Sequence, residues 1–157
     1  MQSSFSTIAC CIELTENNDD IVSYTREMAE LTGAKILLVH VIPSVNSFSG
    51  YGVKKELLQK VADDSRADAE KHVMEFAAQH FKGLACEPLL LTGKVEDALT
   101  DLVDRACADL IIMGSLNSRG LFSFGAKTSA KLIGRSRIPV MIIPNDLSLE
   151  CTPDENF

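Results

Sequence analysis

The feature that most constrains this chain is a regular alternation of short apolar runs with longer amphipathic segments. The strand-like runs are residues 8–12, 35–42, 84–91, 109–113 and 140–143, and the helix-like segments are residues 19–33, 54–82, 95–108 and 127–135. Strands that alternate with helices form a parallel sheet, and the crossover helices lie on its faces. The pattern therefore predicts a single-domain α/β fold, an open five-stranded parallel sheet with helices on both faces.

Local signals place individual strands and the ends of one helix. Lys35–Ile42 is a nearly continuous aliphatic run, which is typical of a parallel strand that is covered on both faces. Pro88 removes one donor from the ladder, so its strand is predicted at an edge of the sheet. Asn18 is a candidate N-cap for the first helix, and Gly33 is a candidate stop. The longest helix is predicted to bury a face lined by Leu58, Val61, Ala69, Val73 and Phe76.

Length and composition limit the classes of protein that fit this pattern. The chain has 157 residues, 46% of them hydrophobic, which is enough for one domain with a sizeable core. We expect that domain over residues 1–144, followed by a polar tail over residues 145–157. The net charge of −7 disfavours non-specific binding to nucleic acid or to an anionic membrane, since both attract basic proteins. Because no apolar run approaches the ~20 residues that cross a bilayer and no secretory leader stands out, a cytoplasmic location is expected.

The cysteines give no indication of a metal or redox site. They are Cys10, Cys11, Cys86, Cys107 and Cys151, and no pair has the spacing of a zinc site or of a CxxC motif. Cys10 and Cys11 are adjacent in a predicted strand, so they would point to opposite faces of the sheet. We expect reduced thiols that pack as small apolar groups, and we assign no metal ligand.

Ligand sites in open parallel sheets lie beyond the carboxyl ends of the strands, where the strand order reverses. The candidate segments are therefore Glu13–Asn17, Val41–Gly52 and Gly114–Gly125, which follow the first, second and fourth strands. Residues 114–144 contain five basic residues and no acidic one, so the rest of the chain carries −12. A basic loop rich in Gly and Ser before a helix is suited to bind an anion. The alternative interpretation is a set of solvated charges, with Arg135 and Arg137 complementing a helix C-terminus.

The signatures of common nucleotide sites and hydrolase sites are absent. The sequence has no GxxxxGK[ST], no GxGxxG after the first strand and no GxSxG. His40, His72 and His80 form no ligand set, and His40 is predicted to be a buried core residue with its hydrogen bonds satisfied. No nucleophile is accompanied by a base and an orienting group, so no catalytic residue is assigned and the chain is not expected to be an enzyme.

Several segments together resemble the universal stress protein family. Ala108–Ser115 (ADLIIMGS) is close to the family's DLIVMGS block and is the specific part of the likeness. Weaker similarities follow in family order over residues 6–144, at Glu13–Thr15, His40–Val41, Gly93–Val95 and Pro139–Val140. The resemblance implies a Rossmann-like fold of the adenine nucleotide alpha hydrolase type, with strand order 3-2-1-4-5. It also implies a homodimer in which strand Val140–Ile143 pairs with its counterpart, which would cover an exposed edge.

Only part of the family's nucleotide motif is present. Members that bind ATP carry G-x2-G-x9-G-[ST]; here Gly114 matches the first glycine and Asn117 stands at the second. Counted back from Pro139–Val140, the final pair falls on Ala126 and Lys127, with an intervening segment one residue shorter than usual, and Gly125 is one residue away. A Cβ at the final pair would obstruct the approach of backbone to phosphate, although Lys127 could supply a charge there. Glu13 stands where the family usually has Asp and is one methylene longer. The contacts that the resemblance implies for a nucleotide are Glu13, Val41, Met113, Gly114, Ser115, Asn117, Gly125, Ala126 and Lys127.

Three functional hypotheses follow from the sequence. The first is a dimeric, universal stress-type regulatory protein of the stress response, with unidentified protein partners and weak or no ATP binding. The second is a genuine sensor of ATP or AMP, in which main-chain groups near Val41 hold adenine and loop amides with Lys127 hold the phosphates. The third is a slow ATP hydrolase or nucleotidyl-transferring enzyme, for which Glu13 or Asp109 would have to act as the general base.

Overall fold

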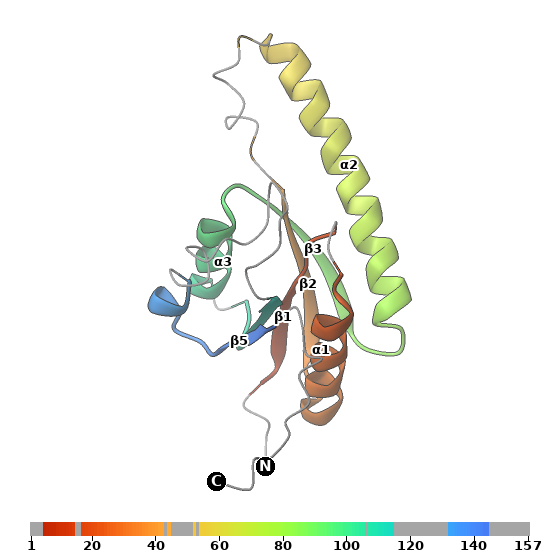
Figure 1. Cartoon of the computed structure of the whole chain (residues 1–157), viewed down its shortest axis with the longest axis vertical. Helices are drawn as coiled ribbons and strands as arrows, with labels where there is room; N and C mark the ends of the chain where they lie inside the picture. Colours follow the sequence, from red (N-terminus) through yellow and green to blue (C-terminus); the bar gives the residue numbers. More distant parts are fainter. Residues whose placement is uncertain are drawn as a thin grey trace, which may run out of the picture.

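The computed structural model describes residues 5–14, 17–42, 44, 52, 54–105, 107–114 and 132–144. The elements follow in the order β1 (Thr7–Cys11), α1 (Asp19–Thr32), β2 (Lys35–Ile42), α2 (Lys55–His80), β3 (Cys86–Thr92), α3 (Val95–Asp104), β4 (Leu110–Gly114) and β5 (Val140–Ile143) (Figure 1). The predicted alternation of strands and helices is confirmed. The predicted polar loop and most of the last predicted helix, residues 115–131, lie outside the described residues, as does the tail from residue 145.

The strands form one parallel sheet in the order β3-β2-β1-β4-β5, as the resemblance implied. β1 is central, and its Ile8 is in register with Ile36 of β2 and Leu110 of β4. Pro88 lies in β3, at one edge of the sheet, which confirms the position inferred from its missing N–H group. A buried central strand flanked by two long-range partners explains why residues 8–12 are apolar without interruption.

Alternation along the strands divides the core into two layers. Ile8 and Cys10 belong to the layer that α1 and α2 cover, whereas Ala9 and Cys11 belong to the layer that α3 covers. Figure 1 shows α1 and α2 on one side of the sheet and α3 on the other. Helices on both faces are therefore confirmed, and so is the opposite orientation of the two adjacent cysteines.

The cysteines do not all pack in the interior as expected. Cys10 and Cys11 are buried, Cys86 is half-buried and Cys107 is exposed, all as free thiols. Cys107 is on the surface because it follows the end of α3, in the turn that leads to β4. Cys151 lies outside the part of the chain that the structure describes.

Both ends of α1 lie where they were predicted. Gly33 terminates the helix with φ of 73°, and its N–H donates to the Ala29 carbonyl oxygen at 2.8 Å, in a conformation that favours glycine. Asn18 occupies the N-cap position, but its side chain makes no cap hydrogen bond. Its Nδ2 instead donates to the Glu13 carbonyl oxygen at 2.9 Å, and Asn17 Oδ1 accepts from the Asp19 N–H. The predicted N-cap position of Asn18 is therefore confirmed, and its main-chain carbonyl accepts from the Val22 N–H, but its side chain does not cap the helix.

α2 is longer than the sheet that it covers. Its 26 residues span about 39 Å, whereas the longest strand, with 8 residues, spans about 26 Å. Only Ala69 and Val73 of α2 are buried, and Val61, which was predicted on the inward face, is 59% exposed. The N-terminal half of the helix therefore extends past the ends of the strands (Figure 1).

Two smaller features complete the described fold. Residues 132–135 are helical in the part of the chain that the structure describes, and Leu132 is buried against the α3 side of the sheet. Among the described residues, no helix has the length and apolar character that a membrane crossing requires.

Candidate functional site

The carboxyl ends of β1, β2 and β4 bring together four of the predicted site residues. Glu13 follows β1, Val41 is near the end of β2, and Met113 and Gly114 end β4. β1 lies between the other two strands, and the crossover through α1 covers one face while the crossover through α3 covers the other. This is the switch point at which open α/β sheets bind ligands.

Five predicted site residues are not placed by the structure. Ser115, Asn117, Gly125, Ala126 and Lys127 lie outside the described residues. The described part of the site is therefore its floor, formed by the strand ends.

The floor is apolar and closely packed. Met113 is fully buried, Val41 is 7% exposed, and Gly114 is buried in register with Ile143. Side chains so enclosed have no polar group to offer to a ligand. Any contact from Val41, Met113 and Gly114 would come from their main-chain N–H and C=O groups.

Glu13 is the acidic side chain placed at this switch point. Its side chain is 14% exposed, and its Oε1 lies 4.0 Å from Nδ1 of His40. That separation is too long for a hydrogen bond but close enough for electrostatic attraction if the imidazole is protonated. The main-chain carbonyl of Glu13 accepts the hydrogen bond from Asn18, which ties the segment after β1 to the start of α1.

His40 links the ends of β1 and β2. Its Nδ1–H donates to the Ile12 carbonyl oxygen at 3.1 Å, which assigns the proton to that nitrogen because a carbonyl oxygen can only accept. The Ile12 N–H donates to the Val39 carbonyl oxygen, so both polar groups of the Ile12 main chain bond to β2 residues. Burial lowers the pKa of His40 below its ordinary value, and the bond to Ile12 opposes that shift.

The prediction that His40 is a buried and satisfied residue is confirmed. Its proximity to Glu13 was missed, because the sequence places the two residues 27 positions apart on different strands. The available signal was their common position at strand ends, since β1 and β2 are parallel.

The start of α3 lies at the same end of the sheet. The Gly93 N–H donates to the Ile42 carbonyl oxygen at 2.9 Å, and Gly93 has φ of 133°, which side chains disfavour. This turn joins the edge strand β3 to a helix that packs over β1 and β4. The Gly93–Val95 segment singled out in the sequence therefore has a structural reason for its glycine.

Asp109 lies at the opposite end of the sheet. Its Oδ2 accepts hydrogen bonds from the N–H groups of Ser6 at 2.8 Å and Thr7 at 2.9 Å, at the amino ends of β1 and β4. The hypothesis that Asp109 acts as a general base at the switch point is therefore wrong. Its carboxylate instead holds the first strand against the fourth.

The described residues contain no group of three or more His, Cys, Asp or Glu that could hold a metal ion. The polar groups of the described floor are consequently the Glu13 carboxylate, the His40 imidazole and the exposed main-chain ends of the strands.

Comparisons with known proteins agree with the fold. Solved structures that align with this chain include the universal stress protein UspA from Lactobacillus plantarum, with a TM-score of 0.69 and 14% identity over 88% of this chain and 97% of that one. A universal stress protein in complex with cAMP gives a TM-score of 0.63 and 17% identity over 92% and 100% of the two chains. A family member from Arabidopsis thaliana with AMP bound gives 0.59 and 21% identity over 90% and 93%. Identities this low establish the fold alone.

The sequence itself matches a family model. None of the curated proteins matches it significantly. The model of the universal stress protein family, however, matches residues 4–144, which include every described strand and helix. This chain belongs to the universal stress protein family.

Proposed function

We propose that this chain is a regulatory protein of the universal stress type, active as a homodimer, in which the switch point binds ATP or AMP weakly or not at all. The observation that carries this proposal is the arrangement of Glu13, whose side chain is only 14% exposed and whose carboxylate lies 4.0 Å from the imidazole of His40. A regulatory role without catalysis is in keeping with a floor that presents one carboxylate and no nucleophile with its base.

The charge and the length of Glu13 support weak binding of a nucleotide. Its partly buried carboxylate repels phosphate groups more strongly than it would in water, because the local dielectric is lower, although the Asp that is usual in the family carries the same charge. The longer side chain of Glu13, compared with the Asp that is usual in the family, also occupies more of the space beside β1. When the imidazole of His40 is protonated, its attraction to this carboxylate would also have to be given up if the carboxylate turned toward a ligand.

The alternative is a genuine nucleotide sensor, and one observation favours it. Solved structures with the same fold are described as complexes with cAMP and with AMP. In this alternative the nucleotide would lie between Glu13, Val41, Met113–Gly114 and the segment Ser115–Lys127. Main-chain groups near Val41 would hold adenine, and loop amides with Lys127 would hold the phosphates.

Calorimetric titration of the nucleotide-stripped protein with ATP and AMP separates the two proposals. Weak binding predicts a millimolar Kd or no measurable heat for the wild type. Glu13→Asp shortens the side chain and restores the residue that is usual in the family, so this variant should bind the nucleotide at least several-fold more tightly than the wild type. The matched variant Glu13→Gln removes the charge at constant length and separates repulsion from crowding. Micromolar binding by the wild type that is lost in Gly114→Val would contradict weak binding and support the sensor.

The dimer is supported by the position of β5 at the other edge of the sheet. Val140, Met141 and Ile142 are all partly exposed, and among the described residues no strand pairs with the outer side of β5. An apolar edge strand of this kind favours pairing with a second strand. A symmetric partner would bury it without creating a new edge.

Light scattering tests the dimer separately from the ligand. The Pro139 carbonyl oxygen accepts from the Ile111 N–H, so by alternation the N–H of Ile142 points to the outer side of β5. Ile142→Pro should therefore convert a dimer to a monomer of 17.1 kDa with a circular dichroism spectrum that stays close to that of the wild type. A wild-type chain that is already a monomer would contradict the proposed dimer.

A further inference from the structure

The projecting half of α2 carries a stripe of four residues that combines charged and apolar side chains. We call Lys54, Leu57, Val61 and Asp64 the α2 stripe. Their spacings of three, four and three residues place them on one side of the helix, in the a and d positions of a heptad. Leu57 is 56% exposed and Val61 is 59% exposed, and Lys54 and Asp64 are exposed as well.

The α2 stripe does not face the sheet. At about 100° per residue, Leu57 and Val61 lie about 80–160° around the helix, roughly a quarter to nearly half a turn, from the buried residues Ala69 and Val73. The stripe also lies in the half of the helix that extends past the strand ends (Figure 1). These two side chains therefore remain accessible when the other side of the helix is packed against the sheet.

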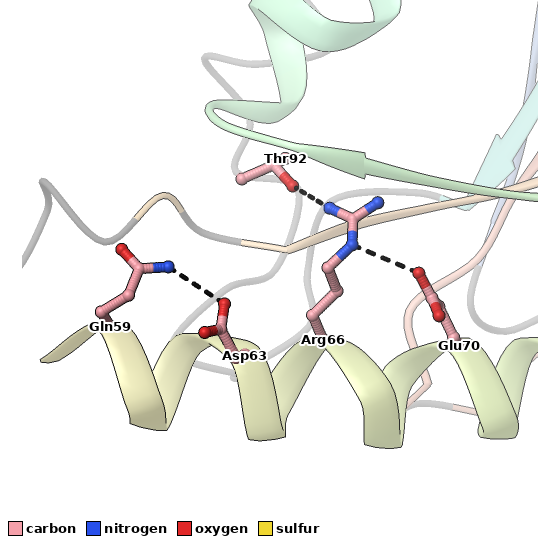
Figure 2. Close-up of polar contacts among 5 residues, drawn as sticks. All are labelled: Gln59, Asp63, Arg66, Glu70 and Thr92. Atoms are coloured by element: carbon pink, nitrogen blue, oxygen red, sulfur yellow. Dashed lines mark hydrogen bonds and ion pairs between the residues drawn. The ribbon is translucent and has the colours of Figure 1, made fainter. Parts of the chain in front are cut away.

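The side of α2 nearly opposite the stripe is occupied by contacts within the molecule, as Figure 2 shows. The Gln59 amide donates to Asp63, and Arg66 donates both to Glu70 at 3.2 Å and to the Thr92 hydroxyl of β3 at 3.1 Å. The last of these bonds ties the middle of the helix to the end of the sheet. No ion pair between described residues involves Lys54 or Asp64, so the charges of the α2 stripe are not matched in this way.

We propose that the α2 stripe is an interface with a second copy of this chain, in which two α2 helices pack antiparallel about a two-fold axis level with Gln59. In this register Leu57 of each helix packs beside Val61 of the other. Lys54 of each helix then faces Asp64 of the other, so both ends of the contact join opposite charges. An antiparallel pair of this kind has two apolar layers at its centre and one charged layer at each end.

The charge of this region suits pairing with itself. Residues 54–64 contain three lysines and three acidic residues and so have no net charge, whereas the whole chain carries −7. Two copies can therefore approach through this segment with much less repulsion than the average surface would cause. A more acidic or more basic partner would leave one half of the stripe with like charges opposed.

The contact is small, and its effect depends on valency. Two layers of Leu and Val cover much less than the roughly 1,600 Å² of a standard stable interface, so an isolated pair of helices should associate weakly. If the chain is already a dimer, each dimer carries two such stripes, and together they raise the effective concentration of one stripe for another. The interface would then build a larger assembly from dimers as protein concentration rises.

Sedimentation velocity over a concentration series tests the proposal with single and mixed variants of the full chain. As its concentration rises, the wild type should show a step to twice the mass that it has at low concentration. Lys54→Glu and Asp64→Lys should each abolish that step, because each places like charges at both ends of the contact. An equimolar mixture of the two variants should regain it, since the acid introduced at position 54 of one chain then faces the lysine introduced at position 64 of the other. The native charges remain at the opposite end of that mixed contact.

The matched control is Lys55→Glu, which changes the same charge one residue away, off the stripe, and should retain the step. A wild type that keeps one mass to millimolar concentration, or a mixture that fails to regain the step, would overturn the proposal and leave a different protein as the occupant of the stripe. The β5 dimer is judged separately, because Ile142→Pro alters the mass at low concentration and the stripe variants do not.

Discussion

The bond from Asp109 to the first strand gives a direct test of what holds the amino end of the sheet together. Its Oδ2 accepts from the N–H groups of Ser6 and Thr7 at 2.8 and 2.9 Å, across more than 100 residues of sequence. Hydrogen bonds to a charged group contribute about 1.5–3 kcal/mol each when buried. Because this site is partly exposed, we take the lower end and expect Asp109→Ala to lower the free energy of unfolding by about 2–3 kcal/mol.

For a chain of this length, that loss corresponds to a fall in Tm of about 4–12 °C. Asp109→Asn keeps one carbonyl acceptor without the charge and should lose about half as much. Urea unfolding followed by far-ultraviolet circular dichroism measures both variants. The main-chain bond from the Asp109 N–H to the Thr7 carbonyl oxygen is retained in each, so the difference reports the side chain.

The matched control is Glu87→Gln at the same end of the sheet. Glu87 pairs with Lys35, but the two side chains are 59% and 47% exposed, so solvent screening leaves at most about 0.5 kcal/mol. If Asp109→Ala costs no more than this control, the two hydrogen bonds do not stabilise the sheet as argued. Nucleotide binding, where measurable, should be the same in Asp109→Ala as in the wild type, because the residue lies at the opposite end from Glu13.

Three further predictions concern pH, thiol chemistry and backbone conformation. Since burial lowers the pKa of His40, the unfolded chain binds more protons in acid than the folded chain, and the free energy of unfolding should fall as pH drops below about 6.5, by at most about 1.4 kcal/mol per pH unit from this group. In a pH series of urea unfolding, His40→Gln should flatten this part of the curve, and an unchanged slope would refute the lowered pKa of His40. Burial raises the pKa of Cys86 to about 11, so Cys86 should react with iodoacetamide at pH 8 much more slowly than the exposed Cys107. Peptide mapping after a short pulse of the reagent measures both, and equal rates of alkylation would be inconsistent with the structure. Gly33→Ala should lower the free energy of unfolding by about 1 kcal/mol because Gly33 has φ of 73°, whereas Gly134→Ala, at a helical position without positive φ, should be neutral or slightly stabilising. Similar denaturation midpoints for the two variants would contradict this expectation.

Much of the fold could be predicted because its signals are local. The aliphatic run of β2 and the last strand, Val140–Ile143, have the predicted bounds, and Pro88 located an edge of the sheet through a single missing N–H group. The strand order came from the resemblance, since apolar runs of similar composition do not specify which neighbour each will pair with. The depth to which α2 is covered could not be predicted, because helical periodicity continues past the end of the sheet and gives Val61 the same pattern as a buried residue.

The grouping of strand ends at the candidate site was predictable, and the contacts between its side chains were less so. The rule that ligands bind at carboxyl ends of strands grouped Glu13, Val41 and Gly114, which the structure places at neighbouring strand ends, and the resemblance added Met113. The same rule could not show that His40 approaches Glu13, since side-chain direction depends on where β1 leaves the sheet. Asp109 was a reasonable acid in the sequence, but it precedes its strand rather than following it, which places it at the wrong end for a ligand.

The central position of β1 has a consequence for synthesis of the chain. β1 leaves the ribosome before the strands that flank it, and β2 can join it soon afterwards, but its other neighbour is β4, with Ile8 in register with Leu110. At about 5–20 residues per second, roughly 5–20 s separate the appearance of the two strands. During that interval the nascent chain exposes an unpaired edge and the apolar side chains of its future core. A chaperone that holds such a chain would have most to protect before translation reaches residue 114, and ribosome-bound fragments that stop before β4 should aggregate more than those that include it.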